Sequence, residues 1–220
     1  IVNAETNVKP VVTPDNSLSE DTIINMIRGA TNEILIQQHQ LRTMWGDEEN
    51  PYLIELAKAV DRGVKISVMF DGTQQQVAES NQYAYLMLNE MKEAGGSIEL
   101  LMYRSPMDEF TRIHNKGMIV DQKFTLISSI NWGSGGGALN REIGIIIESE
   151  DIAEYYREIF WDDWNGRDID EEDTVTDGEE VAEENEEDDG FLGMPSISFV
   201  LAATTLALIS RHLFNRNRLS

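Results

Sequence analysis

The sequence predicts an α/β domain with a mixed β-sheet flanked by helices. Helix and strand patterns alternate from residue 18 to residue 102, and a cluster of three strand patterns follows between residues 116 and 147. Repeated helix–strand units followed by a strand cluster indicate an α/β sandwich with a mixed sheet. We expect this domain to cover residues 18–164, and residues 1–17 to be a linker or the remnant of a preceding domain. The 220 residues allow one such domain with appendages, but hardly two full domains.

Capping and breaking residues mark the helices. In the second expected helix, Asn50 is a suitable N-cap, Pro51 fits the first turn and Gly63 ends the helix. Ser17 or Ser19 is expected to cap the helix before it. The final helix is amphipathic and packs its apolar residues against the sheet. The expected helices cover residues 17–28 or 19–28, 50–63, 76–94 and 151–164.

Short apolar runs and alternating patterns mark the strands. The sequence shows no internal repeat, so the strands are expected to belong to one sheet. The expected strands cover residues 34–36, 64–70, 98–102, 116–120, 124–128 and 142–147.

The net charge of −23 is unevenly distributed along the chain. Residues 162–189 contain 16 acidic residues and one basic residue, a local charge of −15, whereas residues 1–161 carry −11 and residues 190–220 carry +3. The acidic block is poor in apolar residues and repels itself, so residues 165–190 are expected to form a disordered linker rather than a specific acidic binding tail. The absence of cysteine excludes a disulfide scaffold and a thiolate zinc site.

The uncharged stretch at residues 191–210 has the length of a transmembrane helix. Three arginines lie in the tail at residues 211–220, which places that tail in the cytoplasm and everything before residue 191 outside it. A buried core helix would not follow a disordered acidic spacer, and an interfacial helix would need a polar face. The spacer, apolar stretch and terminal arginines also resemble the tails of archaeal surface proteins. We therefore expect a single-pass protein of the cell membrane.

The candidate chemistry lies between residues 113 and 147. His114 and Lys116 are two residues apart in an expected strand, so both side chains project from one face. Together with Ser129 and Asn131 from the following turn, they can form a pocket for an oxyanion such as phosphate. Glu142 is placed to accept from the His114 Nδ1–H and fix the tautomer, which leaves Nε2 free to attack or to donate a proton.

Three further features have less specific interpretations. His39 follows an early strand and can line the cleft, although a histidine without a partner motif more often lies on the surface or in the core. Trp132 is expected to pack in the core or, alternatively, to form a pocket wall. The Gly133–Gly137 run is too flexible for a rigid phosphate cradle, and no Walker pattern is present.

This segment resembles the HKD signature of the phospholipase D superfamily, which reads His, any residue, Lys, four residues, Asp, six residues, Gly-Ser, any residue and Asn. Asn140 and Glu142 also match the family's downstream Asn-x-Glu. Ser128 departs from the pattern at the position of the Gly, where a side chain can narrow the turn beside the phosphate. Residues 50–71 and 151–164 resemble the family's helix–strand unit and closing helix. The signature residues in register are His114, Lys116, Asp121, Ser129 and Asn131.

The resemblance implies a two-step phosphodiester reaction without a cofactor or metal. One histidine attacks phosphorus to give a phosphohistidine, a second histidine protonates the leaving oxygen, and water then releases the product. The resemblance makes His114, Lys116 and Glu142 catalytic, and Asp121 structural. The side chains expected to bind the phosphate are Lys116, Ser129, Asn131 and Asn140.

That reaction requires two HKD motifs, and this sequence contains one. Either two copies form a C2 dimer, or the first motif lies upstream in a longer precursor. Because the sequence opens at Ile1 without an initiator Met or an export signal, we expect the precursor.

The expected substrate is a phosphodiester, with phospholipid favoured because the domain is predicted to be tethered at a membrane. The net charge of −11 on residues 1–161 argues against a long nucleic acid as the substrate. Two alternatives remain: a metal-independent HKD nuclease, and a catalytically silent, membrane-tethered binding module.

Overall fold

The computed structural model describes residues 6–104 and 110–165. The expected acidic linker, membrane segment and basic tail lie outside these residues, apart from Asn165, which ends the last helix. Within the described ranges, no helix combines the length and apolar character needed to cross a bilayer.

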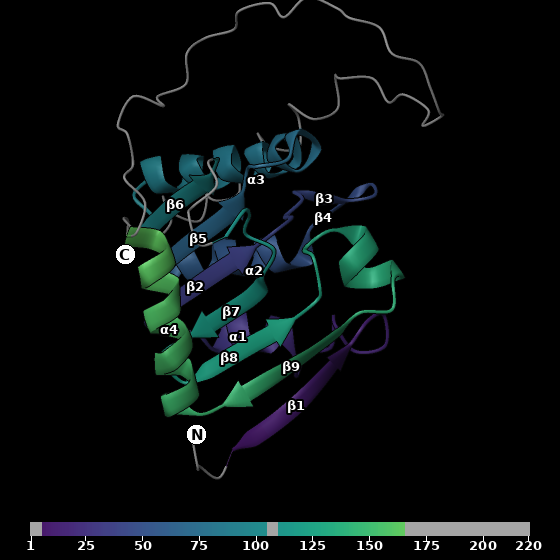
Figure 1. Cartoon of the computed structure of the whole chain (residues 1–220), viewed down its shortest axis with the longest axis vertical. Helices are drawn as coiled ribbons and strands as arrows, with labels where there is room; N and C mark the ends of the chain where they lie inside the picture. The colour runs from purple at the N-terminus through teal and green to yellow at the C-terminus, as the bar shows by residue number, and fades with distance from the viewer. Residues whose placement is uncertain (1–5, 105–109, 166–220) are drawn as a thin grey trace, which may run out of the picture.

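A seven-stranded mixed sheet forms the centre of the molecule, in the order β1-β9-β8-β7-β2-β5-β6 (Figure 1). β2, β5 and β6 run parallel, whereas β7, β8, β9 and β1 continue the sheet as antiparallel pairs. The prediction of a mixed sheet is therefore confirmed. The strands are β1 (Asn7–Val12), β2 (Glu33–Gln38), β5 (Lys65–Asp71), β6 (Ile98–Tyr103), β7 (Lys116–Val120), β8 (Phe124–Ser128) and β9 (Ile143–Glu148), and a separate hairpin pairs β3 (Met44–Trp45) with β4 (Glu48–Glu49).

Helices cover both faces of the sheet, and β2 shows how its side chains divide between them. Ile34 and Ile36 pack in the larger core with residues of α1, α2 and α3, whereas Leu35 packs in the smaller core under α4. Full burial of each such side chain contributes about 1.5–3 kcal/mol. The helices are α1 (Ile23–Gly29), α2 (Pro51–Asp61), α3 (Gln75–Glu93) and α4 (Glu150–Asn165).

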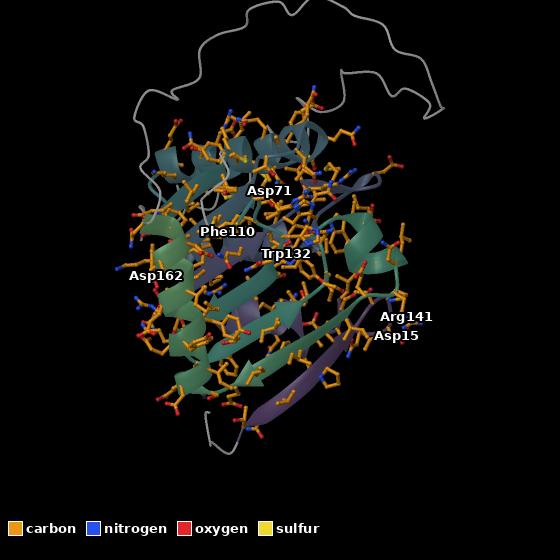
Figure 2. The ribbon with its side chains drawn as sticks, in the orientation of Figure 1. Asp15, Asp71, Phe110, Trp132, Arg141 and Asp162 are labelled. Carbon is orange, nitrogen blue, oxygen red and sulfur yellow. The ribbon has the colours of Figure 1, made fainter. Side chains whose placement is uncertain are left out.

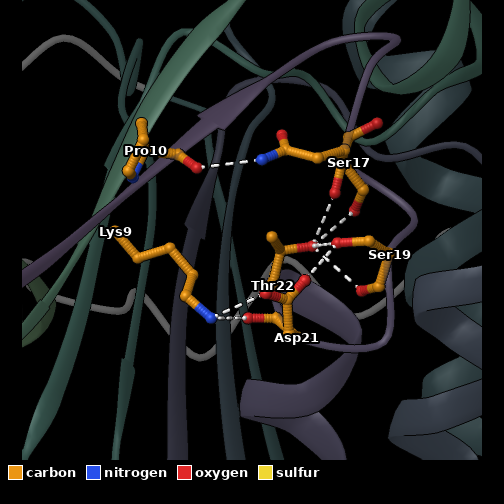
Figure 3. A network of polar contacts seen from close by, with 7 residues as sticks. Lys9, Pro10, Ser17, Ser19, Asp21 and Thr22 are labelled. Atoms are coloured by element: carbon orange, nitrogen blue, oxygen red, sulfur yellow. Dashed lines mark hydrogen bonds and ion pairs between the residues drawn. The ribbon is translucent and has the colours of Figure 1, made fainter.

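The two predicted helix caps have different outcomes. Asn50 caps α2 as predicted, because its side chain accepts from the Tyr52 N–H at 2.9 Å. The predicted serine caps of α1 are wrong: the helix begins at Ile23, Ser17 Oγ donates to Gly137 O, and Ser19 Oγ donates to Asp21. Figure 3 shows the polar network in the loop before α1, in which the Thr22 hydroxyl lies close to Ser17 O and the Ser19 hydroxyl donates to Asp21. The serines therefore stabilise the loop and its packing on residues far along the chain.

The structure also differs from the expected domain start at residue 18. Residues 7–12, which we expected to precede the domain, form β1 and pair along their whole length with β9. Val11 is fully buried, so this strand belongs to the core of the domain. Pro10 lacks an N–H and restricts its strand to an edge position, which is where β1 lies. Because strand pairing depends on the distant β9, local sequence alone did not reveal it.

Candidate active site

The candidate site lies at one edge of the sheet, where ends of β2, β5, β7, β8 and β9 lie side by side (Figure 1). Gln38 at the end of β2 pairs with Lys116 at the start of β7, Lys116 pairs with Ser128 at the end of β8, and Ser128 pairs with Gly144 in β9. β5 lies beside β2 and ends at Asp71. Side chains that are up to about a hundred residues apart in the sequence are therefore gathered at this edge.

His114 and Lys116 come together as their spacing predicts. Lys116 is buried, with 6% of its surface exposed, and its Nζ lies 3.1 Å from His114 Nδ1 and donates to His114 O at 2.6 Å. Burial lowers the pKa of the Lys116 ammonium, while the charges of Glu142 and Asp71 oppose this shift. The result is a buried cation directly beside an exposed imidazole.

The His114 imidazole has a pKa below its ordinary value. Desolvation is the largest cause of the lowered pKa, followed by the charges of Lys116 and Arg112, whereas Asp71 raises it. A lowered pKa keeps the imidazole neutral near pH 7, and a neutral imidazole is the form that can attack phosphorus.

Glu142 makes a different contact from the one we expected. Its Oε2 accepts from Ser129 Oγ at 2.5 Å, and the His114 Nδ1 faces Lys116 instead. Ser129 Oγ also accepts from the Ile143 N–H at 3.2 Å. The carboxylate therefore orients Ser129 and acts on Lys116 through its charge, so the expected Glu142–His114 hydrogen bond is absent from this structure.

Ser128 lies at the glycine position of the signature, and its hydroxyl forms hydrogen bonds with backbone groups. Its Oγ donates to Lys116 O at 2.6 Å and accepts from the Ile130 N–H at 3.3 Å. The space for this side chain comes from Gly144 on the neighbouring strand, where an added Cβ would lie 2.7 Å from Ser128 Cβ. The hydroxyl thus connects the strand that carries Lys116 to the turn that carries Ser129.

The two candidate asparagines differ in their surroundings. Asn131 Oδ1 is buried and lacks a hydrogen-bond partner among the described residues. Asn140 is exposed, and its backbone N–H and O are bonded to Gly135 O and Thr13 Oγ1. Asn131 therefore retains hydrogen-bonding capacity inside the site, while Asn140 lies at its surface.

The glycine run after Asn131 is ordered, contrary to our expectation of a flexible loop. Residues Gly135–Leu139 form a π-helical turn. A Cβ at Gly136 would lie 2.6 Å from Asn131 O, and one at Gly137 would lie 2.1 Å from Trp45. The glycines are thus required by close packing against Asn131 and Trp45.

Trp132 packs in the core. Its side chain is fully buried, and its ring lies 4.9 Å from that of Tyr52. Figure 2 labels Trp132 and Asp71 in the central region of the molecule, well away from the exposed Arg141–Asp15 pair.

Asp121 lies at the opposite end of β7 from Lys116. Its carboxylate accepts from the backbone N–H groups of Thr31, Asn32 and Glu33 and from the Thr31 hydroxyl, at 2.7–3.0 Å. Burial acts to raise the pKa of Asp121, but the hydrogen bonds from Asn32, Glu33 and Thr31 outweigh it and lower the pKa. In this structure Asp121 ties the β7–β8 turn to the loop before β2.

Sequence reasoning missed the site residue Asp71, and it named His39 as able to line the cleft while favouring a surface or core position. Asp71 is fully buried, its Oδ2 lies 3.3 Å from His39 Nδ1, and the His39 ring lies 4.5 Å from the His114 ring. Each residue ends, or directly follows, one of two neighbouring parallel strands. Functional side chains collect at the carboxyl ends of parallel strands, and that rule was the available signal.

Cations, donors and carboxylates are thus brought together at this edge. Within residues 6–104 and 110–165 there is no group of three or more His, Cys, Asp or Glu side chains placed to hold a metal ion. The arrangement presents the Lys116 ammonium and the exposed His114 imidazole to an anion, with the buried His39 ring against His114 and the buried Asp71 beside His39.

The molecule is therefore an α/β domain whose sheet edge presents a buried lysine beside His114, with His39 against the His114 ring. Residues 23–164 match the family described as "Cardiolipin synthase, PLD-like domain", and the chain belongs to this phospholipase D-like family. No curated protein matches the chain.

Solved structures share the fold at low sequence identity. NucT from Helicobacter pylori is 14% identical with a TM-score of 0.58, and the match covers 73% of this chain and 97% of that one. Nuc from Salmonella typhimurium, a phospholipase D family member, is 20% identical with a TM-score of 0.56, covering 73% and 95%. Phosphatidylserine synthase from Haemophilus influenzae Rd KW20 is 14% identical with a TM-score of 0.53, and the match covers 74% of this chain but 39% of that one.

Proposed function

We propose that this protein is a membrane-anchored, phospholipase D-like phosphodiesterase with phospholipid as the favoured substrate. The observation that supports this most directly is the contact between the exposed imidazole of His114 and the buried ammonium of Lys116. Lys116 Nζ and Asn131 Nδ2 are the proposed donors for the non-bridging phosphate oxygens, and Ser129 can join them only if its hydroxyl turns from Glu142 to the phosphate.

In the proposed reaction, a neutral His114 forms a bond to phosphorus as the bond to the leaving oxygen breaks. The leaving oxygen takes a proton from a second imidazole, and water then cleaves the phosphohistidine. Lys116 stabilises the negative charge that develops on the phosphoryl group. These residues carry out the steps without a metal or cofactor.

We propose that the second HKD motif comes from a second copy of the chain rather than from an upstream domain. The match covers nearly all of NucT and Nuc, so a domain of this size corresponds to almost the whole of each of those chains. Ile143 and Ile145 of β9 are 63% and 36% exposed beside the site. A second copy related by C2 symmetry can cover them and bring His114 of the partner subunit to the opposite side of the phosphate.

The alternative function is a metal-independent nuclease. The likeness to NucT and Nuc supports it, because the match spans those chains far more completely than it spans phosphatidylserine synthase. The charge of −11 on residues 1–161 supports the phospholipid instead, since it offers little surface for releasing counterions from a long polyanion.

Turnover of bis(p-nitrophenyl) phosphate by the full chain tests for enzymatic activity. We expect His114→Ala to abolish turnover and Asn115→Ala, a substitution at the exposed neighbouring position, to retain it. Turnover should survive EDTA, and complete loss with EDTA would refute the metal-free reaction. An inactive wild-type protein that binds vesicles would support the silent binding module.

Competition between substrates then separates the two enzymatic functions. Phospholipid vesicles should inhibit turnover of the small substrate more strongly than single-stranded DNA at equal phosphate concentration. Stronger inhibition by the DNA, together with its cleavage, would favour the nuclease. Flotation of the full chain with vesicles, compared with a chain that ends before residue 191, tests the proposed anchor.

A further inference from the structure

A second imidazole lies directly beside the proposed nucleophile. The ring centroids of His39 and His114 are 4.5 Å apart, and the rings are tilted by 50°. His39 is 8% exposed, whereas His114 lies in the exposed class. The exposed His114 ring therefore packs against a ring that is itself buried.

The position of His39 is fixed by several contacts. Its Nδ1 lies 3.3 Å from Ile113 O and 3.3 Å from Oδ2 of the fully buried Asp71. Asp71 Oδ2 has no aligned hydrogen bond from the described residues, and His39 Nδ1 approaches it at 3.3 Å. The Nδ1 proton is directed towards Ile113 O and Asp71, which leaves His39 Nε2 as the acceptor.

Asn81 of α3 holds the backbone of both partners. Its Nδ2 donates to His39 O at 2.8 Å and to Asp71 O at 2.7 Å, and its Oδ1 accepts from the Leu41 N–H at 2.8 Å. The ends of β2 and β5 are therefore clamped together by a fully buried amide. Such a clamp leaves His39 little freedom to move.

The geometry excludes His39 as the acid that protonates the leaving group of His114. In-line displacement places the nucleophile and the leaving oxygen on opposite sides of phosphorus, so the two imidazole nitrogens must be separated by about 6 Å with the phosphoryl group between them. The ring centroids of His39 and His114 are only 4.5 Å apart, which leaves no room for a phosphoryl group between them. His39 must therefore act on His114 and not on the substrate.

We propose that His39, held by Asp71, is a positioning residue that fixes the His114 ring in its reactive orientation. This inference rests on the proposed function, because it assigns His39 a role in the same reaction. If the His114 ring is misoriented, the reaction slows because the reacting atoms no longer align. Ground-state binding of the phosphate depends mainly on the other donors. The loss should therefore appear in kcat rather than in KM.

The test compares His39→Ala with His39→Phe in the full chain. We expect His39→Ala to lower kcat about tenfold or more at nearly unchanged KM, and His39→Phe to restore most of the loss because it retains a ring face. Gln40→Ala, in the same loop, is the matched control. If His39→Ala does not fold, His39→Asn replaces it, since the amide can still donate towards Ile113 O but offers no ring.

A titration of the imidazole ¹⁵N signals gives a readout independent of turnover. The charged groups that act on His114 are Lys116, Arg112 and Asp71, with His39 as its ring neighbour. Removing the His39 ring rehydrates His114, so the pKa of His114 should rise in His39→Ala and stay near the wild-type value in His39→Phe. The chain has three histidines, so single substitutions assign each signal.

The outcomes separate this inference from the proposed function. A wild-type kcat in a folded His39→Ala protein would overturn the inference. It would also be overturned if His39→Phe were as inactive as His39→Ala, because that result would indicate proton transfer by His39 itself. If the wild-type protein shows no turnover, the proposed function fails. An unchanged His114 titration in His39→Ala would then overturn the positioning role as well.

Discussion

Ser128 and Gly144 face each other across β8 and β9, and their sizes compensate each other. A Cβ at residue 144 would lie 2.7 Å from Ser128 Cβ, 3.3 Å from Ile127 O and 3.4 Å from Leu126 Cδ1. Overpacking of this kind costs about 1–3 kcal/mol, against which Gly→Ala returns about 0.4–1 kcal/mol through the unfolded chain. We therefore expect Gly144→Ala to lower the free energy of unfolding by about 1–2 kcal/mol.

The Ser128→Gly substitution should rescue this loss. It removes the closest contact and leaves the two at 3.3 and 3.4 Å, which are close to ordinary packing distances. Urea unfolding of the wild type, both single variants and the double variant gives the coupling free energy, which we expect to be about 1 kcal/mol or more in the favourable direction. Gly29→Ala is the control, since an added Cβ there meets nothing within 4 Å. Independent effects of the two substitutions would refute the compensation.

Two further predictions concern the buried and half-buried carboxylates. The charge of Asp71 raises the pKa of His114, so Asp71→Asn should lower that pKa. The acidic limb of the pH profile of kcat/KM should then move to lower pH. A shift to higher pH would contradict the assigned charge effect. Asp121 has a folded-state pKa below its ordinary value, so the stability it contributes is present above about pH 4 and is lost as the pH falls towards the folded-state pKa. Asp121→Ala should cost about 1–3 kcal/mol in urea unfolding at pH 7, with a smaller difference from the wild type below pH 4, while kcat of the folded protein stays within about twofold. Equal stability of the two proteins at pH 7 would contradict the role of its hydrogen bonds.

The sequence predicted those parts of the fold that depend on local patterns. The Asn50 cap, the alternating residues of β5 and the closely spaced strands β7 and β8 are all signalled within a few residues. β1 was missed because its pairing depends on β9, about 140 residues away, and because Pro10 weakens its local pattern. The serine caps failed because Ser17 bonds to Gly137, which is also distant in the sequence.

The candidate site shows the same division between local and long-range information. The contact between His114 and Lys116 follows from a spacing of two in a strand, so a motif reveals it. The partners of His114 do not follow from that motif. His39 and Asp71 come from two other strands, and only the sheet order β7-β2-β5 places them beside it.

The carboxylates at this edge would oppose phosphate binding only if they faced the ligand. Glu142 is engaged by the Ser129 hydroxyl, and Asp71 is fully buried behind His39. Both charges raise the pKa of Lys116 against the effect of its burial, so they favour the charged ammonium that a phosphate requires. An acidic domain can thus offer a site for a single phosphodiester when its carboxylates contact other side chains and favour the charged form of a buried lysine.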